Sequence, residues 1–272
     1  MSQLSCVVLS LIGLVSGAGH ASAQVVSVEH VANVGDTVGR GVPIGSLTDL
    51  MVLDDDRILL SDLRNQRVLL FDEAGRFVRP LGGPLIGVLL VRGDDGATEL
   101  FTAGQKLVYP RDLQNPVTRA VPYDVPGVAF TRVGMHYIRA GSRRADESAG
   151  LPIHVFRRDG NRFRRSFGAD PPIRDVRNSA LFSRRFSASS DSTFWSADLL
   201  RFRLQHWTDE GTLLQEFTRD PEWFPRQTET GLDPVEGSRP RIAEICYDPA
   251  ANVLWVATTV AREDWADAPT RA

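Results

Sequence analysis

The sequence predicts an all-β fold, a β-propeller built from four-stranded antiparallel blades. Three ribbons with the same layout recur along the 272 residues, each with an aromatic residue four positions before a glycine. Short runs of alternating apolar and polar residues precede them, and no stretch of ten or more residues shows the 3.6-residue period of a helix. The ribbons are Val68–Gly75, Ile153–Gly160 and Leu204–Gly211.

Each ribbon predicts a β-hairpin. The aromatic residues are Phe71, Phe156 and Trp207, and a second alternating stretch follows each glycine. The glycine supplies the positive φ that a type I turn followed by a bulge requires. Because similarity at intervals of tens of residues determines the architecture, we expect a propeller over 44–272 with blades that start near residues 44, 85, 127, 184 and 241.

Two further strand-like runs lie upstream of each hairpin and bring each unit to four strands. In the first unit they are Leu50–Leu53 and Arg57–Ser61, separated by an acidic turn. The unit at about 85–125 matches worst, because its strands at 86–91, 99–102 and 106–109 lack the glycine hairpin. The remaining pairs are Val128–Thr131 with Met135–Ile138, Phe186–Ser189 with Thr193–Ser196, and Ile245–Tyr247 with Val253–Val256.

Residues 1–23 have the features of a secretory signal peptide. The apolar run Cys6–Val15 is followed by small residues and Ala21-Ser22-Ala23, which predicts a mature start at Gln24 and a secreted or periplasmic protein. The run is too short to cross about 30 Å of hydrocarbon, so no stable membrane anchor is expected after cleavage. The alternative is a buried N-terminal helix.

The strand count leaves the propeller open. Four complete units and the first two strands of a fifth end near Val260, so we expect the C-terminal blade or blades to be missing from this chain, or exposed edges that invite self-association. Within 24–43, the alternation of Val25–Val31 makes it a candidate for the strand that ties the ends together. A five-bladed ring closed by tail residues is the alternative.

The segment Asp56–Gly75 resembles the NHL and TolB-like repeats of the six-bladed β-propeller superfamily. Phe194-Trp195, Pro221–Pro225 and Val253–Val256 resemble a secreted bacterial branch of that group whose members are mostly uncharacterised. The resemblance implies a six-bladed fold. It does not select a function, because the wider group includes ligand-binding scaffolds, lactonases and lyases.

The search for catalytic chemistry is negative. No G-x-S-x-G, H-E-x-x-H or phosphate-binding glycine loop occurs, and no two histidines stand at metal-ligand spacing. We therefore predict no catalytic residue, no metal site and no cofactor. A net charge of −3 indicates no bulk attraction for nucleic acid. The acids and amides that a channel site would need are not selected by any spacing: Glu29, Asp49, Asn115, Asp191 and Asp248.

Two features are candidates for a binding surface. Residues 132–203 hold 15 Arg against 7 Asp and Glu, and the doublet Arg184-Arg185 lies in this basic sector. The sector predicts an anionic partner, unless its arginines merely face solvent from outer strands. Trp223 and Phe224 occupy a proline-bounded loop, where aromatic residues serve either as binding anchors or as a plug between blades.

The expected function is binding. We predict a secreted, non-catalytic propeller that takes a protein or a small or anionic ligand through inter-blade loops on one face, at 169–185 and 219–241. The alternative is a metal-assisted hydrolase or lyase of the lactonase kind, with a divalent ion at the central channel. Convergent carboxylates would favour the enzyme, and hydroxyl groups such as those of Ser187 and Ser189 would favour the binder.

Overall fold

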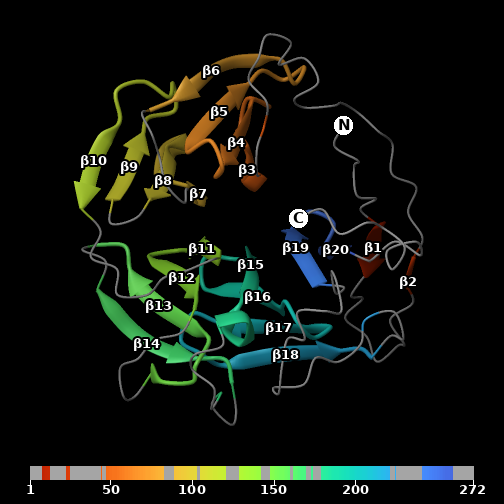
Figure 1. Cartoon of the computed structure of the whole chain (residues 1–272). Coiled ribbons are helices and arrows are strands. Elements are labelled where there is room, and N and C mark those ends of the chain that lie inside the picture. Colours follow the sequence, from red (N-terminus) through yellow and green to blue (C-terminus); the bar gives the residue numbers. More distant parts are fainter. Residues whose placement is uncertain are drawn as a thin grey trace, which may run out of the picture. The chain divides into compact units, whose positions relative to one another are not determined.

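The computed structural model describes residues 8–12, 23–24, 44, 47–82, 89–102, 105–120, 129–141, 148–159, 162–169, 173, 179–220, 224 and 241–259. Over these residues the fold is an all-β propeller of four-stranded antiparallel blades, as predicted (Figure 1). The helices among them are single 3-10 turns, η1 (Asp94–Gly96) and η3 (Ser179–Phe182). The chain divides into two compact units, Glu29–Asp124 and Val125–Ala272 with Met1–Val28.

The unit Glu29–Asp124 holds two blades. In both, strands that are neighbours in sequence are neighbours in the sheet, and the first strands β3 and β7 pack against each other. Leucines from both blades, with Val68 and Tyr109, fill the core between them. The strands are β3 (Leu47–Val52), β4 (Ile58–Asp62), β5 (Arg67–Phe71) and β6 (Phe77–Leu81), then β7 (Leu89–Arg92), β8 (Thr98–Thr102), β9 (Gln105–Tyr109) and β10 (Val117–Ala120).

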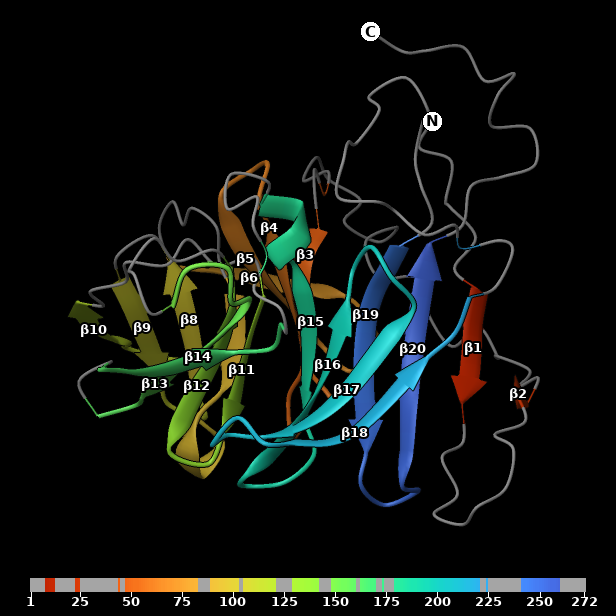
Figure 2. The same ribbon diagram turned by 90° about the horizontal axis from the view of Figure 1, so that it is seen from below.

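The other unit holds three four-stranded sheets. Two are meanders, and the third joins the last two strands of the chain to two N-terminal strands in the order β19-β20-β1-β2 (Figure 2). The meanders are β11 (Ala129–Val133), β12 (His136–Ala140), β13 (Ile153–Arg157) and β14 (Phe163–Phe167), and β15 (Arg184–Ala188), β16 (Thr193–Asp198), β17 (Arg203–Thr208) and β18 (Leu213–Thr218). The third sheet has β19 (Arg241–Asp248), β20 (Val253–Thr259), β1 (Val8–Ile12) and β2 (Ala23–Gln24).

The hairpin prediction is confirmed where the turn is described. Gly75 and Gly211 have φ of +75° and +88°. Each closes a tight turn, in which the Gly75 amide donates to the Asp72 carbonyl at 3.0 Å. In all three hairpins the register shifts at the aromatic residue, which is the bulge that the glycine pattern predicts.

The third sheet differs from the expectation. The strand count predicted a last blade of which this chain holds only the first two strands, whereas β20 pairs antiparallel with β1 from Val8 opposite Thr258 to Ile12 opposite Leu254. An apolar run that stays attached satisfies the free backbone groups of a neighbouring edge by pairing as a strand. Val8–Ile12 is therefore extended, and not part of a helix. The predicted closing strand Val25–Val31 lies outside the described residues, and the signal peptide stays a prediction.

Candidate functional site

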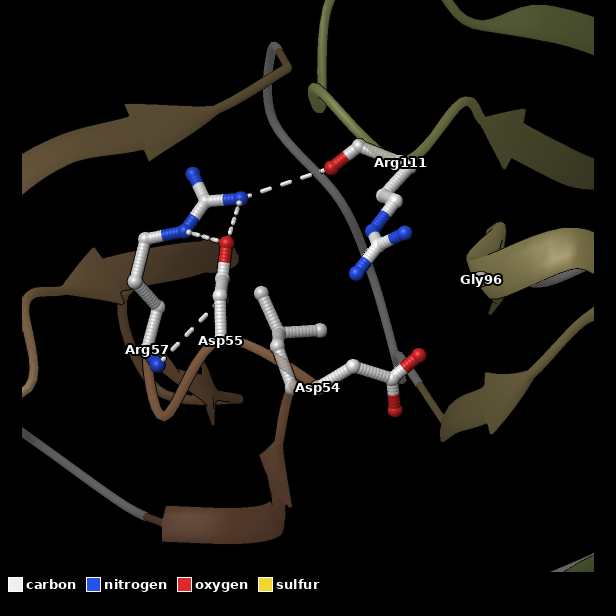
Figure 3. Close-up of a pocket in the computed structure, with 6 residues that line it drawn as sticks. Asp54, Asp55, Arg57, Gly96 and Arg111 are labelled. Carbon is white, nitrogen blue, oxygen red and sulfur yellow. Dashed lines mark hydrogen bonds and ion pairs between the residues drawn. The ribbon is translucent and has the colours of Figure 1, made fainter.

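A shallow hollow, open to solvent and with a cavity volume of about 10 Å³, lies between the two blades of the unit Glu29–Asp124. One wall is the turn that joins β3 to β4, and the other is η1 between β7 and β8 together with the residue that follows Pro110 after β9. Its lining combines one apolar side chain with charged ones of both signs (Figure 3). The lining residues are Leu53, Asp54, Asp55, Arg57, Gly96 and Arg111.

Two ion pairs fix the walls of the hollow. Arg57 donates through Nε to Asp55 Oδ2 at 2.8 Å, and its Nη2 reaches the carbonyl oxygen of Arg111 at 3.4 Å (Figure 3). Arg92 binds Asp54 Oδ1 and also donates to the Val52 carbonyl at 2.7 Å. The two blades are thus tied together at the rim of the hollow by charge-assisted hydrogen bonds.

The position of the hollow follows from the topology. In an antiparallel meander, the turn between the first and second strands and the turn between the third and fourth lie at the same end of the sheet. The three lining segments are such turns, so they meet at one end of these blades. Connections between blades leave from the opposite end. The hollow is therefore built from turns within blades, and the inter-blade loops favoured by the sequence lie mostly outside the described residues.

Gly96 keeps the hollow open. Its φ is +75°, and a Cβ added there would lie 3.3 Å from Arg111 Cδ and 3.5 Å from Asp54 Oδ2. The Arg111 side chain consequently crosses close over the backbone of η1. Among the described residues its guanidinium has no hydrogen-bond or ion-pair partner, in contrast to those of Arg57 and Arg92.

Other charged groups of this unit serve the blades themselves. Asp62 is fully buried and accepts hydrogen bonds from Arg67 Nη2 at 3.1 Å and Asn65 Nδ2 at 2.7 Å. This cluster falls in the segment that resembles the NHL repeat. Lys106 and Glu99 form a buried ion pair at 3.1 Å in the second blade. Charges buried with their partners in this way hold strands together and are not offered to a ligand.

A second polar cluster lies in the fourth blade, in the unit Val125–Ala272 with Met1–Val28. The Ser189 hydroxyl is 2.8 Å from His206 Nε2 and 2.8 Å from Thr193 Oγ1. The His206 ring stacks on Trp195 with centroids 4.6 Å apart and planes within 8°. Burial lowers the pKa of His206 below its ordinary value and favours the neutral ring, whose tautomer decides which of the two groups donates. A hydroxyl–imidazole contact is the kind that activates a nucleophile, but no carboxylate among the described residues orients the ring.

A third cluster joins the third and fourth blades. His136 Nδ1 is 2.6 Å from Asp209 Oδ2, and its Nε2 accepts from Arg164 Nη1 at 2.9 Å. Since a guanidinium only donates, this arrangement fixes the neutral tautomer with its proton on Nδ1. The backbones of the same two blades also approach closely at Gly134 and Asp191. We assign the cluster to blade packing.

The four residues that the sequence proposed for binding lie apart. Arg184 is 3% exposed, pairs with Asp198 at 3.5 Å and donates to the carbonyls of Leu181 and Ser183. Burial, opposed by Asp198, lowers the pKa of its guanidinium. Arg185 donates to the Ala243 carbonyl at 2.6 Å and lies 3.6 Å from Glu244. These are contacts within and between blades, and a role of either arginine in ligand binding stays a prediction.

The aromatic loop is described at one position only. Phe224 is 2% exposed and packs edge-on against Phe202 with ring centroids 5.8 Å apart, in a core that spans the fourth and last blades. This is the environment of a plug between blades. Trp223 lies outside the described residues.

Among the described residues, no arrangement of side chains supports the alternative of an enzyme with its site at the central channel. Asp49 accepts from the Leu90 amide at 2.7 Å, and Asp248 caps the turn that follows it through the Ala250 amide at 2.9 Å. Within the described ranges no three His, Cys, Asp or Glu side chains gather as metal ligands do. The hydrolase alternative stays a prediction. The described residues also contain no helix long and apolar enough to cross a membrane.

Arg111 could not be predicted as a site residue from the sequence. It follows Pro110 in an irregular connection, and nothing in its neighbourhood marks it as different from the other arginines. The lining residues are far apart in sequence and meet only because two blades pack side by side. The one available signal was the acidic turn after Val52, which was interpreted as a β-turn and does form one.

Comparisons with known proteins find only distant structural similarity. The structure is similar to PorZ, a bacterial surface component of the type-IX secretion system of Porphyromonas gingivalis (12% identity, TM-score 0.46, 78% of this chain and 23% of that one). It is also similar to virginiamycin B lyase from Staphylococcus aureus (12% identity, TM-score 0.47, 79% of this chain and 66% of that one). A streptogramin B lyase is similar at the same level (10% identity, TM-score 0.48, 80% of this chain and 95% of that one). No family model and no curated protein sequence matches the chain. Similarities this distant assign no function to the chain.

Proposed function

We propose that this protein is a binding propeller that takes a protein or a small anionic ligand at the turn end of its blades. The proposal includes export, with residues 1–23 as the leader and a secreted or periplasmic mature chain, and membership of the six-bladed NHL and TolB-like group. The resemblance of Asp56–Gly75 to that group's repeats and the leader-like N-terminus support these two parts.

The hollow of the first two blades carries the proposal. Ligand sites are concave, largely pre-formed and furnished with a few convergent polar groups. Here the walls are held by ion pairs, one wall residue is a leucine, and one guanidinium is left without a partner among the described residues. Loops and turns on a rigid sheet scaffold are also where binding groups gather in propellers and other β folds.

The test is a fragment screen by amide chemical shifts on the ¹⁵N-labelled chain. The fragments should include anions, cations and neutral compounds, so that the result does not depend on ligand class. We expect hits to shift the amides of Leu53–Arg57 and of Gly93–Gly96. The β5–β6 turn at Asp72–Gly75, which does not line this hollow, is the internal control and should not respond. Absence of hits, or hits that map away from the turn ends, would refute the proposal.

A further inference from the structure

Among the residues that the structure describes, the hollow offers one cation without an ion-pair partner to a ligand. Of the three guanidinium groups at its rim, that of Arg57 is neutralised by Asp55 and that of Arg92 by Asp54. Arg111 remains, and its side chain points into the hollow (Figure 3). The hydrogen bond from Arg57 to the Arg111 carbonyl holds the backbone from which this side chain projects. A guanidinium presents five N–H donors in a planar fork and no acceptor.

An unused acceptor lies beside this donor. Asp54 binds Arg92 through Oδ1, while its Oδ2 accepts no hydrogen bond from the described residues. Both Asp54 Oδ2 and Arg111 Cδ lie within 3.5 Å of the point where a Cβ of Gly96 would stand. A ligand entering over Gly96 therefore meets a donor fork and a carboxylate oxygen together, with Leu53 as the apolar wall.

These groups select the charge and shape of the ligand. The fork matches the two oxygens of a carboxylate in a bidentate pair. A phosphate dianion is disfavoured, because Asp54 and Asp55 line the hollow and Asp56, Asp94 and Asp95 lie in the same turns. The negative charges of these aspartates oppose a second negative charge on the ligand. We therefore expect a ligand with a single negative charge, held by direct contact with Arg111.

The second oxygen of Asp54, whose side chain is exposed, favours a ligand that carries a donor next to the carboxylate. An amide N–H on the carbon that bears the carboxylate meets this need, as in an N-acylated amino acid or the C-terminal residue of a peptide. Resting on the proposed binding function, we propose that the hollow binds α-amido carboxylates, with the carboxylate on Arg111 and the amide N–H on Asp54. The side chain of the bound residue then faces Leu53.

The test is titration of the full chain with N-acetylalanine, followed by amide chemical shifts in the two turns. N-acetylalanine amide, which lacks the charge, should bind at least about tenfold more weakly, as expected for loss of a charge-assisted pair. Inorganic phosphate should also bind more weakly. A peptide with a free C-terminal alanine and its amidated twin separate the two sources. Binding of the free peptide as tight as that of N-acetylalanine, with the amidated twin weaker, assigns the site to chain ends, and weaker binding of the free peptide than of N-acetylalanine assigns it to small acylated amino acids.

Four variants locate the contact. Arg111→Gln should weaken N-acetylalanine binding about tenfold or more, and Arg111→Lys should weaken it less, because it keeps the charge and loses the fork. Arg76→Gln is the matched control: it removes an exposed arginine from the β5–β6 turn of the same unit and should leave binding unchanged. Asp54→Asn should weaken the binding of N-acetylalanine. It should not weaken the binding of propionate, which has no N–H to donate.

Two outcomes would overturn the assignment. In the first, the Arg111→Gln variant binds N-acetylalanine as tightly as the wild type does, and it also unfolds at the same temperature as the wild type. The other is a hollow that binds fragments of other classes but neither carboxylate probe. The second outcome would leave the binding function standing and remove only the ligand class, whereas the absence of any binder would remove both.

Discussion

Replacing Arg184 by alanine should cost the fourth blade much of its stability. The guanidinium is buried, 3.5 Å from Asp198 and hydrogen-bonded to the carbonyls of Leu181 and Ser183 at 3.2 and 3.0 Å. Its removal leaves the nearly buried Asp198 carboxylate without its cation. Removing one partner of such a pair typically costs about 3–5 kcal/mol. We expect a loss of that size in the free energy of unfolding measured with urea.

The control is Arg201→Ala in the same blade. Arg201 is exposed, and its guanidinium has no partner among the described residues, so the change should stay within about 0.5 kcal/mol. The double variant Arg184→Met with Asp198→Leu removes both charges together and should lose less than Arg184→Ala alone. If Arg184→Ala is no more destabilised than Arg201→Ala, the buried pair does not stabilise the blade and our interpretation of Arg184 is wrong.

This result also determines how the basic sector should be tested. Reversing the charge of both Arg184 and Arg185 would unfold the blade before it could report on an anionic partner. Arg185→Gln is the informative change, since Arg185 is only partly buried and makes one backbone hydrogen bond and one loose ion pair. If the folded variant elutes from an anionic resin at a lower salt concentration than the wild type, the result supports binding of an anionic partner by the basic sector. An unchanged salt concentration would refute it.

Three further predictions concern other sites. Gly134→Ala should cost about 2–3 kcal/mol in urea unfolding, because the added Cβ would lie 2.3 Å from the Asp191 carbonyl oxygen at a φ of +50°. Burial lowers the pKa of His206, so the stabilisation by the neutral ring is complete above 6.5 and is lost as the pH falls toward the folded-state pKa. His206→Gln should flatten the fall in urea midpoint between about pH 7 and about pH 5. Burial and two neighbouring carboxylates raise the pKa of the Cys246 thiol. In a Cys6→Ser background it should react with iodoacetamide more slowly than free cysteine, and an equal rate would contradict this.

The fold was predictable where the constraint is local. A glycine with positive φ four residues after an aromatic marks a bulged hairpin whatever surrounds it, and these hairpins lie where the pattern placed them. The strand β10 was missed for an equally physical reason. All four of its residues, Val117–Ala120, are exposed, so neither face buries a side chain and no alternation appears in the sequence.

The binding site was harder to predict because it is made by packing. Arg184 and Arg185 are neighbours in sequence, but successive side chains of a strand point to opposite faces of the sheet. One therefore pairs with Asp198 inside the blade, and the other reaches Ala243 on β19. Conversely, Asp54 and Arg111 belong to different blades and meet at one hollow. In a β protein, residues adjacent in sequence can therefore face different environments, and residues in the turns of adjacent blades can meet although they are far apart in sequence.

For the N-terminal apolar run, the sequence and the structure lead to different expectations. Its composition predicts a leader that is cleaved before Gln24, whereas its backbone at Val8–Ile12 pairs with β20 as the third strand of the last blade. One molecule cannot have both, because a cleaved leader leaves the pairing groups of β20 without this partner. Hydrogen exchange separates the two states. In the chain that keeps residues 1–23, the β20 amides that face β1 should be protected, and in a chain that starts at Gln24 they should exchange faster unless another strand takes the place of β1. Equal protection in the two chains would show that β1 is not needed at this edge, and it would return Val25–Val31 as the candidate to fill it.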